Sequence, residues 1–110
     1  MSAVLLFHVD DANRWPNLLA NVRNAQAAAP GRSLRVVANG QAPVSLWAKG
    51  HWRREIEERI SAGVRIDFCE NSLHNLGLDP DDRPAGSQLV PAGIIAIADA
   101  QEAGALYIKP

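Results

Sequence analysis

The chain has 110 residues, with 11 Lys and Arg residues against 12 Asp and Glu residues, a formal net charge of −1, and 47% hydrophobic residues. This composition is typical of a soluble globular protein, so we expect residues 1–110 to form a single domain that needs no metal or disulfide for stability. The near-neutral charge argues against a nucleic-acid partner, because that affinity comes from clustered Lys and Arg. The basic pair Arg53 and Arg54 is followed at once by glutamates, a pattern typical of a solvated helix face.

No apolar run approaches the roughly 18 residues that a membrane span requires. The first residues, Met1 to Val4, lack the basic start and the cleavage site of a secretory signal. We therefore expect a cytoplasmic protein with no membrane partner. Cys69 is the single cysteine, so it cannot form a disulfide within the chain.

The first third of the chain predicts a strand, a helix and a second strand. Residues 3–9 are almost wholly apolar, as in a strand that is buried on both faces. Apolar residues then recur at intervals of three and four, which predicts a helix over 14–29 that Pro30 and Gly31 end. A second strand over 33–38 stops at the turn dipeptide Asn39-Gly40.

The middle of the chain predicts two helical segments, over 42–48 and 51–62, and then a third strand. Over 64–68 apolar and polar residues alternate, which indicates a more exposed strand near an edge of the sheet. The remaining segments are a short helix over 71–76, a loop over 78–87, a strand over 88–90, a helix over 92–103 and a strand over 105–108.

This alternation of strands and helices predicts an α/β fold: three α/β/α layers around a mainly parallel five-stranded sheet, flavodoxin-like in general layout. The helix over 92–103 is expected to bury one stripe against the sheet. That stripe consists of Ile94, Ile95, Ile97 and Ala98.

In an open α/β sheet, ligands bind outside the carboxyl ends of the strands, and this rule selects the candidate site residues. We expect Cys69 to be the catalytic residue. The expected substrate-binding residues are His8, Asp10, Asn39, Gly40, Asn71, Ser72 and Gly93. Lys109 also follows a predicted strand at this edge. The sequence contains no close pair of metal ligands such as His-x-x-x-His or Cys-x-x-Cys, so we expect no metal.

Cys69 carries the sharpest chemical signal. A thiol at a strand end that precedes a helix lies near the positive end of the helix dipole, which favours the thiolate that a nucleophile or a sulfur carrier needs. Two alternatives stay open. Cys69 can be a buried and inert small side chain, or it can act with His8 and Asp10 as a hydrolase or transferase, which requires His8 within hydrogen-bond reach of the sulfur.

Large apolar side chains also predict self-association. Trp47 and Trp52 lie within six residues of each other, and the strand over 105–108 is mostly apolar. A single small domain has little room to hide all of these groups, so we expect a homo-oligomer.

Several short motifs, taken together in their order and spacing, resemble the DsrE/DsrF-like family of small intracellular sulfur-relay proteins. The motifs are Phe7-His8-Val9-Asp10-Asp11, Arg14-Trp15-Pro16, Val36-Val37-Ala38-Asn39-Gly40, Gly63-Val64, Phe68-Cys69-Glu70-Asn71-Ser72-Leu73, Val90-Pro91-Ala92-Gly93, Gln101, Gly104 and Tyr107-Ile108-Lys109-Pro110.

The resemblance implies a five-stranded parallel sheet and a homo-oligomer, a trimer or a hexamer, with the cysteine near a subunit interface. It also implies that Cys69 accepts persulfide sulfur from a donor protein and passes it to an acceptor protein, as a sulfur carrier or sulfurtransferase without a cofactor. The alternative is a non-catalytic homo-oligomeric module of the same fold that binds a small ligand or serves assembly.

Overall fold

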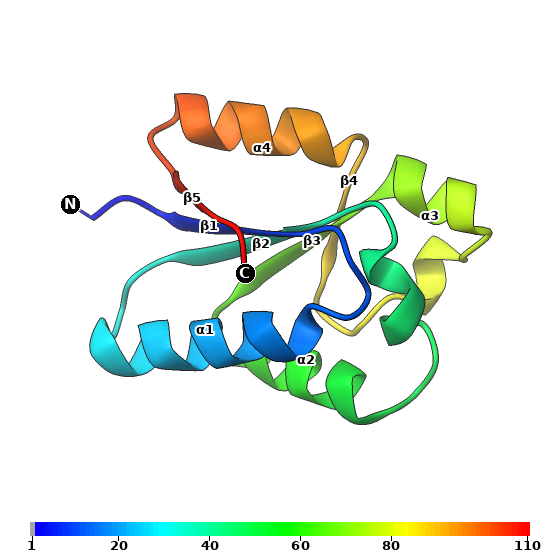
Figure 1. Ribbon diagram of the computed structural model, residues 1–110, viewed down its shortest axis with the longest axis horizontal. Helices are drawn as coiled ribbons and strands as arrows, with labels where there is room; N and C mark the ends of the chain where they lie inside the picture. Colours follow the sequence, from blue (N-terminus) through cyan, green and yellow to red (C-terminus); the bar gives the residue numbers. More distant parts are fainter. Residues whose placement is uncertain (1) are drawn as a thin grey trace.

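The structure is a computed structural model that describes residues 2–110, so Met1 of the expected domain lies outside it. Residues 2–110 form one five-stranded, wholly parallel sheet in the order β4-β3-β2-β1-β5 (Figure 1). The strands are β1 (Leu5–Val9), β2 (Leu34–Ala38), β3 (Arg65–Cys69), β4 (Gln88–Val90) and β5 (Leu106–Ile108). The predicted α/β class and parallel sheet are confirmed.

The helices cover the two faces of the sheet unequally. Two helices, α1 (Trp15–Ala28) and α2 (His51–Ser61), lie on one face, whereas α4 (Gly93–Glu102) crosses the other face alone (Figure 1). The short helix α3 (Glu70–Leu76) follows β3 directly at the carboxyl edge. Two 3-10 helices, Ala42–Leu46 and Pro80–Asp82, lie in the loops.

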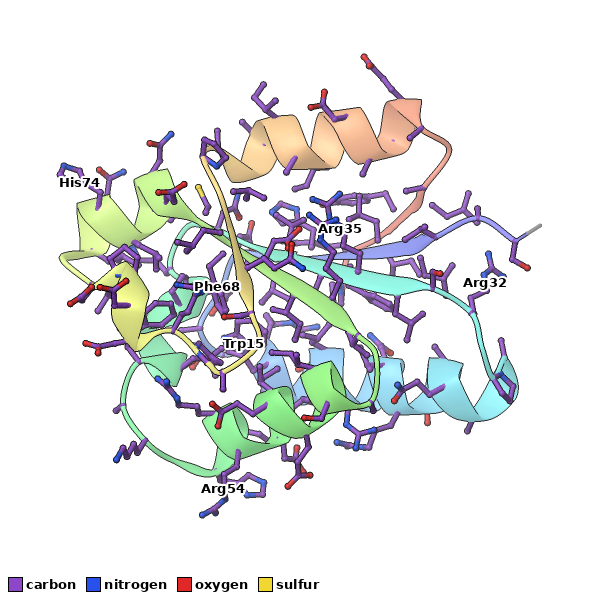
Figure 2. The ribbon with its side chains drawn as sticks, turned by 180° about the vertical axis from the view of Figure 1, so that it is seen from behind. Trp15, Arg32, Arg35, Arg54, Phe68 and His74 are labelled. Atoms are coloured by element: carbon purple, nitrogen blue, oxygen red, sulfur yellow. The ribbon has the colours of Figure 1, made fainter. Side chains whose placement is uncertain are left out.

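The main core lies between the sheet and α1 and α2. Trp15 and Phe68 are fully buried there, with ring centroids 6.3 Å apart, and Figure 2 shows both on the side of these helices. The indole N–H of Trp15 donates to the carbonyl oxygen of Ala42 at 2.8 Å, so the buried ring leaves no polar atom unpaired. This bond also fixes the loop after β2 to the start of α1.

The prediction of an exposed edge strand over 64–68 is wrong. The observed strand β3 pairs with both β2 and β4, and four of its five residues are buried. The misleading residue is Asp67, which is fully buried beneath the α4 side of the sheet. It accepts hydrogen bonds from Arg35 at 2.7 Å and Arg65 at 3.0 Å, so its polarity marks an ion pair and not contact with solvent. Figure 2 shows Arg35 between the sheet and α4.

The predicted buried stripe of α4 is also wrong in part. Ile97 is buried against Leu6 and Val37, but Ile94 and Ile95 are 65% and 57% exposed. Residues 93, 97 and 100 lie three and four positions apart and so share the face toward the sheet, while the two isoleucines point away from it. Ala98 is exposed as well. An apolar surface therefore remains uncovered at the first turn of α4.

The paired tryptophans have different surroundings. Trp47 packs edge-on against Phe68 at 5.1 Å and donates its indole N–H to the carbonyl oxygen of Asp79 at 2.7 Å. Trp52 keeps 37% of its surface exposed. The fold therefore accounts for Trp47 within one chain.

The sequence context of Arg53 predicted a solvated helix face, and this prediction is wrong. The Arg53 guanidinium donates to the carbonyl oxygens of Leu46, Asp82 and Arg83, and so joins α2 to two loops. Arg54 is exposed, as expected (Figure 2). In the part of the chain that the structure describes, no helix is both long and apolar enough to cross a bilayer.

Candidate functional site at the carboxyl edge

The parallel register brings the predicted site residues to one edge of the sheet. His8 is aligned with Val37, Val37 with Asp67, and Cys69 with Val90. The loops that follow β1, β2, β3 and β4 therefore begin side by side. Cys69 and the predicted binding residues all lie at this edge, although they divide into a group around the thiol and a group around His8.

Cys69 is the last residue of β3 and is only 4% exposed. Its Sγ accepts a hydrogen bond from the backbone N–H of Gly93, the first residue of α4, at 3.2 Å. Burial raises the pKa of the Cys69 thiol, but hydrogen bonds from the Ser72 hydroxyl and from the backbone N–H groups of Gly93, Ser72 and Asn71 lower it further than burial raises it. The net pKa lies below the ordinary value, so the thiolate forms more readily here than in an ordinary cysteine.

Ser72 and Gly40 form a bridge between the loops after β2 and β3. The backbone N–H of Gly40 donates to Ser72 Oγ at 2.9 Å, which leaves the hydroxyl hydrogen of Ser72 to point toward the sulfur. Asn71 is exposed, and its backbone N–H donates to the carbonyl oxygen of Pro91 at 3.4 Å and makes the smallest of the named contributions that lower the Cys69 pKa.

Gly93 is needed because the backbone approaches two side chains closely. A Cβ atom at position 93 would lie 3.1 Å from the Cβ of Asn39 and 3.3 Å from the Cβ of Cys69, and 3.4 Å from Asn39 Nδ2. Because glycine has no Cβ, the first residue of α4 can lie in contact with the sulfur. The same contact places the amide group of Asn39 beside the first turn of α4.

His8 does not form a catalytic pair with Cys69. Its Nε2 atom is 2.8 Å from Asn39 Oδ1, and its Nδ1 atom is 2.6 Å from the hydroxyl of Tyr107. Both ring nitrogens are thus engaged, and no hydrogen bond joins His8 to the sulfur among the described residues. This geometry does not support the hydrolase alternative, because that chemistry requires the base to reach the nucleophile.

Asp10 and Lys109 form an ion pair at the carboxyl ends of β1 and β5. Lys109 Nζ lies 2.6 Å from Asp10 Oδ1. The hydrogen bond from Lys109 lowers the pKa of the Asp10 carboxyl, and this effect together with the nearby positive charge exceeds the opposing effect of burial. Asp10 is therefore tied to the last residues of the chain, away from the thiol.

Tyr107 is the site residue that sequence reasoning missed. It is aligned with Leu6 and therefore shares a face of the sheet with His8, two residues further along β1. The alternation of side chains between the two faces of each strand indicates which residues share a face within that strand. The sequence pattern did not show that β5 lies next to β1, and without that neighbour relation the contact could not be inferred.

The described residues, 2–110, contain no group of three or more His, Cys, Asp or Glu side chains that could hold a metal ion. A cavity of about 550 Å³ lies on the far side of the first turn of α4, beside Val90, Pro91 and Ile95. Arg35 also lines it, and His8 is not among its lining residues.

The fold and the site define a small, wholly parallel α/β protein with one cysteine held at the carboxyl edge of its sheet. Comparison with solved structures gives a protein of unknown function, MTH1491 from Methanobacterium thermoautotrophicum. It has 32% sequence identity and a TM-score of 0.91, and the match covers 99% of this chain and 100% of that one. The chain belongs to the same family as MTH1491.

Two more distant structures share the fold. A conserved protein of unknown function, BT1422 from Bacteroides thetaiotaomicron, has 14% identity and a TM-score of 0.81 over 97% of this chain and 94% of that one. The ychN protein from E. coli has 12% identity and a TM-score of 0.83 over the full length of both. No protein-family model and no curated protein matches the chain.

Proposed function

We propose that this protein is a sulfur carrier or sulfurtransferase of the DsrE/DsrF-like type, which accepts and passes persulfide sulfur on Cys69 in the cytoplasm. The observation that carries the proposal is the hydrogen bond from the Gly93 N–H to Cys69 Sγ. It belongs to a set of neutral donors that stabilise negative charge on sulfur, and the reactive form in sulfur exchange is the thiolate.

The proposed reaction needs no oxidant and no second cysteine in this chain. The Cys69 thiolate attacks the outer sulfur of a donor persulfide, R–S–SH. A bond forms between Cys69 Sγ and that sulfur while the donor S–S bond breaks, and the donor leaves as the thiolate R–S⁻. In the second step an acceptor thiolate attacks the outer sulfur of Cys69–S–SH, and Cys69 leaves as the thiolate.

The donors around the thiol suit both steps. In the first step they hold the attacking thiolate, and in the second they stabilise Cys69 as the leaving group. Ser72 lies in the first turn of α3, and Gly93 is the first residue of α4, which supports the proposal. His8 is engaged with Asn39 and Tyr107, so the proposal assigns it no proton transfer to sulfur.

We further propose that the protein works as a homo-oligomer, a trimer or a hexamer. The exposed residues Ile94 and Ile95 lie directly after Gly93, so an apolar surface adjoins the thiol. Exposed large apolar groups of this kind are typical of association surfaces. Light scattering should give a mass above that of one chain, and a strict monomer would contradict this part of the proposal.

One observation favours a second candidate, a non-catalytic module that binds a small ligand or serves assembly. Cys69 is 4% exposed, as is usual for a cysteine that acts only as a small apolar side chain. The two functions predict different effects of Cys69→Ala. A sulfur carrier loses sulfur acceptance and keeps nearly its full melting temperature, whereas a structural cysteine leaves a cavity and causes a large drop.

The test is the intact mass of the folded protein after exposure to a small-molecule persulfide. The wild-type chain should gain the mass of one sulfur atom and lose it again to an added thiol. The Cys69→Ala variant should gain none. A wild-type chain that takes up no sulfur while folded would contradict the proposal and leave the ligand-binding module as the better account.

A further inference from the structure

Tyr107, His8 and Asn39 form a continuous line of hydrogen bonds that ends beside the thiol site. The Tyr107 hydroxyl lies 2.6 Å from His8 Nδ1, and His8 Nε2 lies 2.8 Å from Asn39 Oδ1. The three side chains come from β5, from β1 and from the residue that follows β2. These hydrogen bonds hold the Asn39 amide in one orientation only if the donor and the acceptor in each of them are fixed.

With a neutral His8 ring, the atoms determine one consistent arrangement. An amide oxygen only accepts hydrogen bonds, so His8 Nε2 carries the hydrogen and donates it to Asn39 Oδ1. A neutral ring then has a lone pair on Nδ1, which accepts the hydrogen of the Tyr107 hydroxyl. The other arrangement would require Asn39 to rotate by half a turn, so that Nδ2 pointed at His8.

The orientation of Asn39 matters because its Nδ2 atom lies on the side of Gly93. That atom is 3.4 Å from the position that a Cβ of residue 93 would occupy, and the Cβ of Cys69 is 3.3 Å from the same position. Nδ2 has no hydrogen-bond partner among the described residues, and within that part of the chain no buried side-chain nitrogen or oxygen lacks one. Nδ2 therefore has its two hydrogens available at a solvent-accessible position beside Gly93, which Cys69 also contacts.

We infer that Tyr107 is a positioning residue: through His8 it holds Asn39 with its Nδ2 hydrogens directed toward the sulfur carried at Cys69. The inference rests on the proposed function, because that function is what identifies the sulfur as the outer atom of a persulfide on Cys69. It adds a neutral donor for the outer, anionic sulfur of a persulfide, beyond the reach of the backbone donors at Sγ. Tyr107 acts at a distance and does not touch the reacting atoms.

The test uses the full-length chain labelled with ¹⁵N and the variant Tyr107→Phe, which keeps the ring and removes the hydroxyl. Tyr107 is the single tyrosine and is 42% exposed, so the change leaves the core intact. The matched control is Leu106→Ala, which alters the neighbouring exposed side chain on the other face of β5.

Two readouts are measured on each protein. The ring ¹⁵N shifts of His8 report its tautomer, and the side-chain amide signals of Asn39 report whether Nδ2 keeps one orientation. The titratable groups around this edge are His8 on β1 and Asp10 after it, Glu70 and His74 on α3, and Tyr107 on β5 and Lys109 after it. None of these except Tyr107 differs between the variants.

The wild-type chain and Leu106→Ala should show His8 with hydrogen on Nε2. Tyr107→Phe should show both tautomers and a second set of Asn39 side-chain amide signals, because Asn39 no longer stays in one orientation. A wild-type His8 with hydrogen on Nδ1, or unchanged Asn39 side-chain signals in Tyr107→Phe, would overturn the inference. If these shifts appear but the wild-type chain takes up no sulfur, the proposed function fails while the positioning role stands.

Discussion

The sulfur of Cys69 lies 3.2 Å from the backbone nitrogen of Gly93, although 24 residues separate the two positions in the chain. The contact joins the end of β3 to the start of α4 and leaves no room for a side chain at residue 93. The start of α4 is therefore both part of the packing of the sheet and part of the environment of the thiol.

Gly93→Ala should destabilise the fold by about 1–3 kcal/mol, because the added Cβ would crowd Asn39 and Cys69 at 3.1 and 3.3 Å. Urea unfolding followed by tryptophan fluorescence measures the change. Gly50→Ala is the control, because a Cβ at position 50 would have no neighbour within 4 Å and its φ of 179° suits any residue. Equal losses in the two variants would contradict the packing at residue 93.

Asp67→Asn should destabilise the fold by about 3 kcal/mol, because it removes the charge that compensates the mostly buried guanidinium of Arg35. Arg65→Gln should cost less, about 1 kcal/mol or below, since the Arg65 side chain is 47% exposed. Denaturant unfolding of both variants tests this order. A near-neutral Asp67→Asn would show that the ion pair does not hold β2 and β3 together.

Lys109→Ala should reduce stability at neutral pH by a few tenths of a kcal/mol, since the Asp10–Lys109 pair is largely exposed to solvent. The pKa of Asp10 is lowered in the folded state, so the pair stabilises the fold above the unfolded pKa of about 3.9, and this contribution is lost as the pH falls through the folded pKa.

The difference between the wild-type chain and Lys109→Ala should therefore shrink on acidification below about pH 4. Melting temperatures at several pH values measure it. Lys49→Ala is the matched control, because Lys49 is the other lysine of the chain and is exposed. A difference that grows toward low pH would contradict the assignment.

Local patterns were sufficient to predict most of the fold. The buried strand β1, the apolar stripe of α1 from Trp15 to Val22 and the turn at Asn39-Gly40 all have strong signals within a few residues. The errors arose where the pairing partner is distant in the sequence. Asp67 looked like a solvent contact because its partner Arg35 lies on another strand, and the stripe of α4 was misjudged because isoleucine gives no indication of which face a sheet will cover.

In the candidate site too, the features with local signals could be predicted, and the contacts between distant segments could not. The carboxyl edge could be inferred from the strand–helix alternation alone, so Cys69, Ser72 and Gly93 were found together. The role of His8 depended on Tyr107, whose position next to β1 is a property of the strand order β4-β3-β2-β1-β5.

The most direct test of the thiolate at Cys69 is its rate of alkylation by iodoacetamide in the folded protein, measured against pH. Cys69 is the single cysteine, so the rate reports one site. The hydrogen bonds from Ser72, Gly93 and Asn71 predict modification at neutral pH, with an apparent pKa below the value of about 8.5 of an ordinary thiol. A thiol that reacts only when the protein unfolds, or that titrates above that value, would contradict the account.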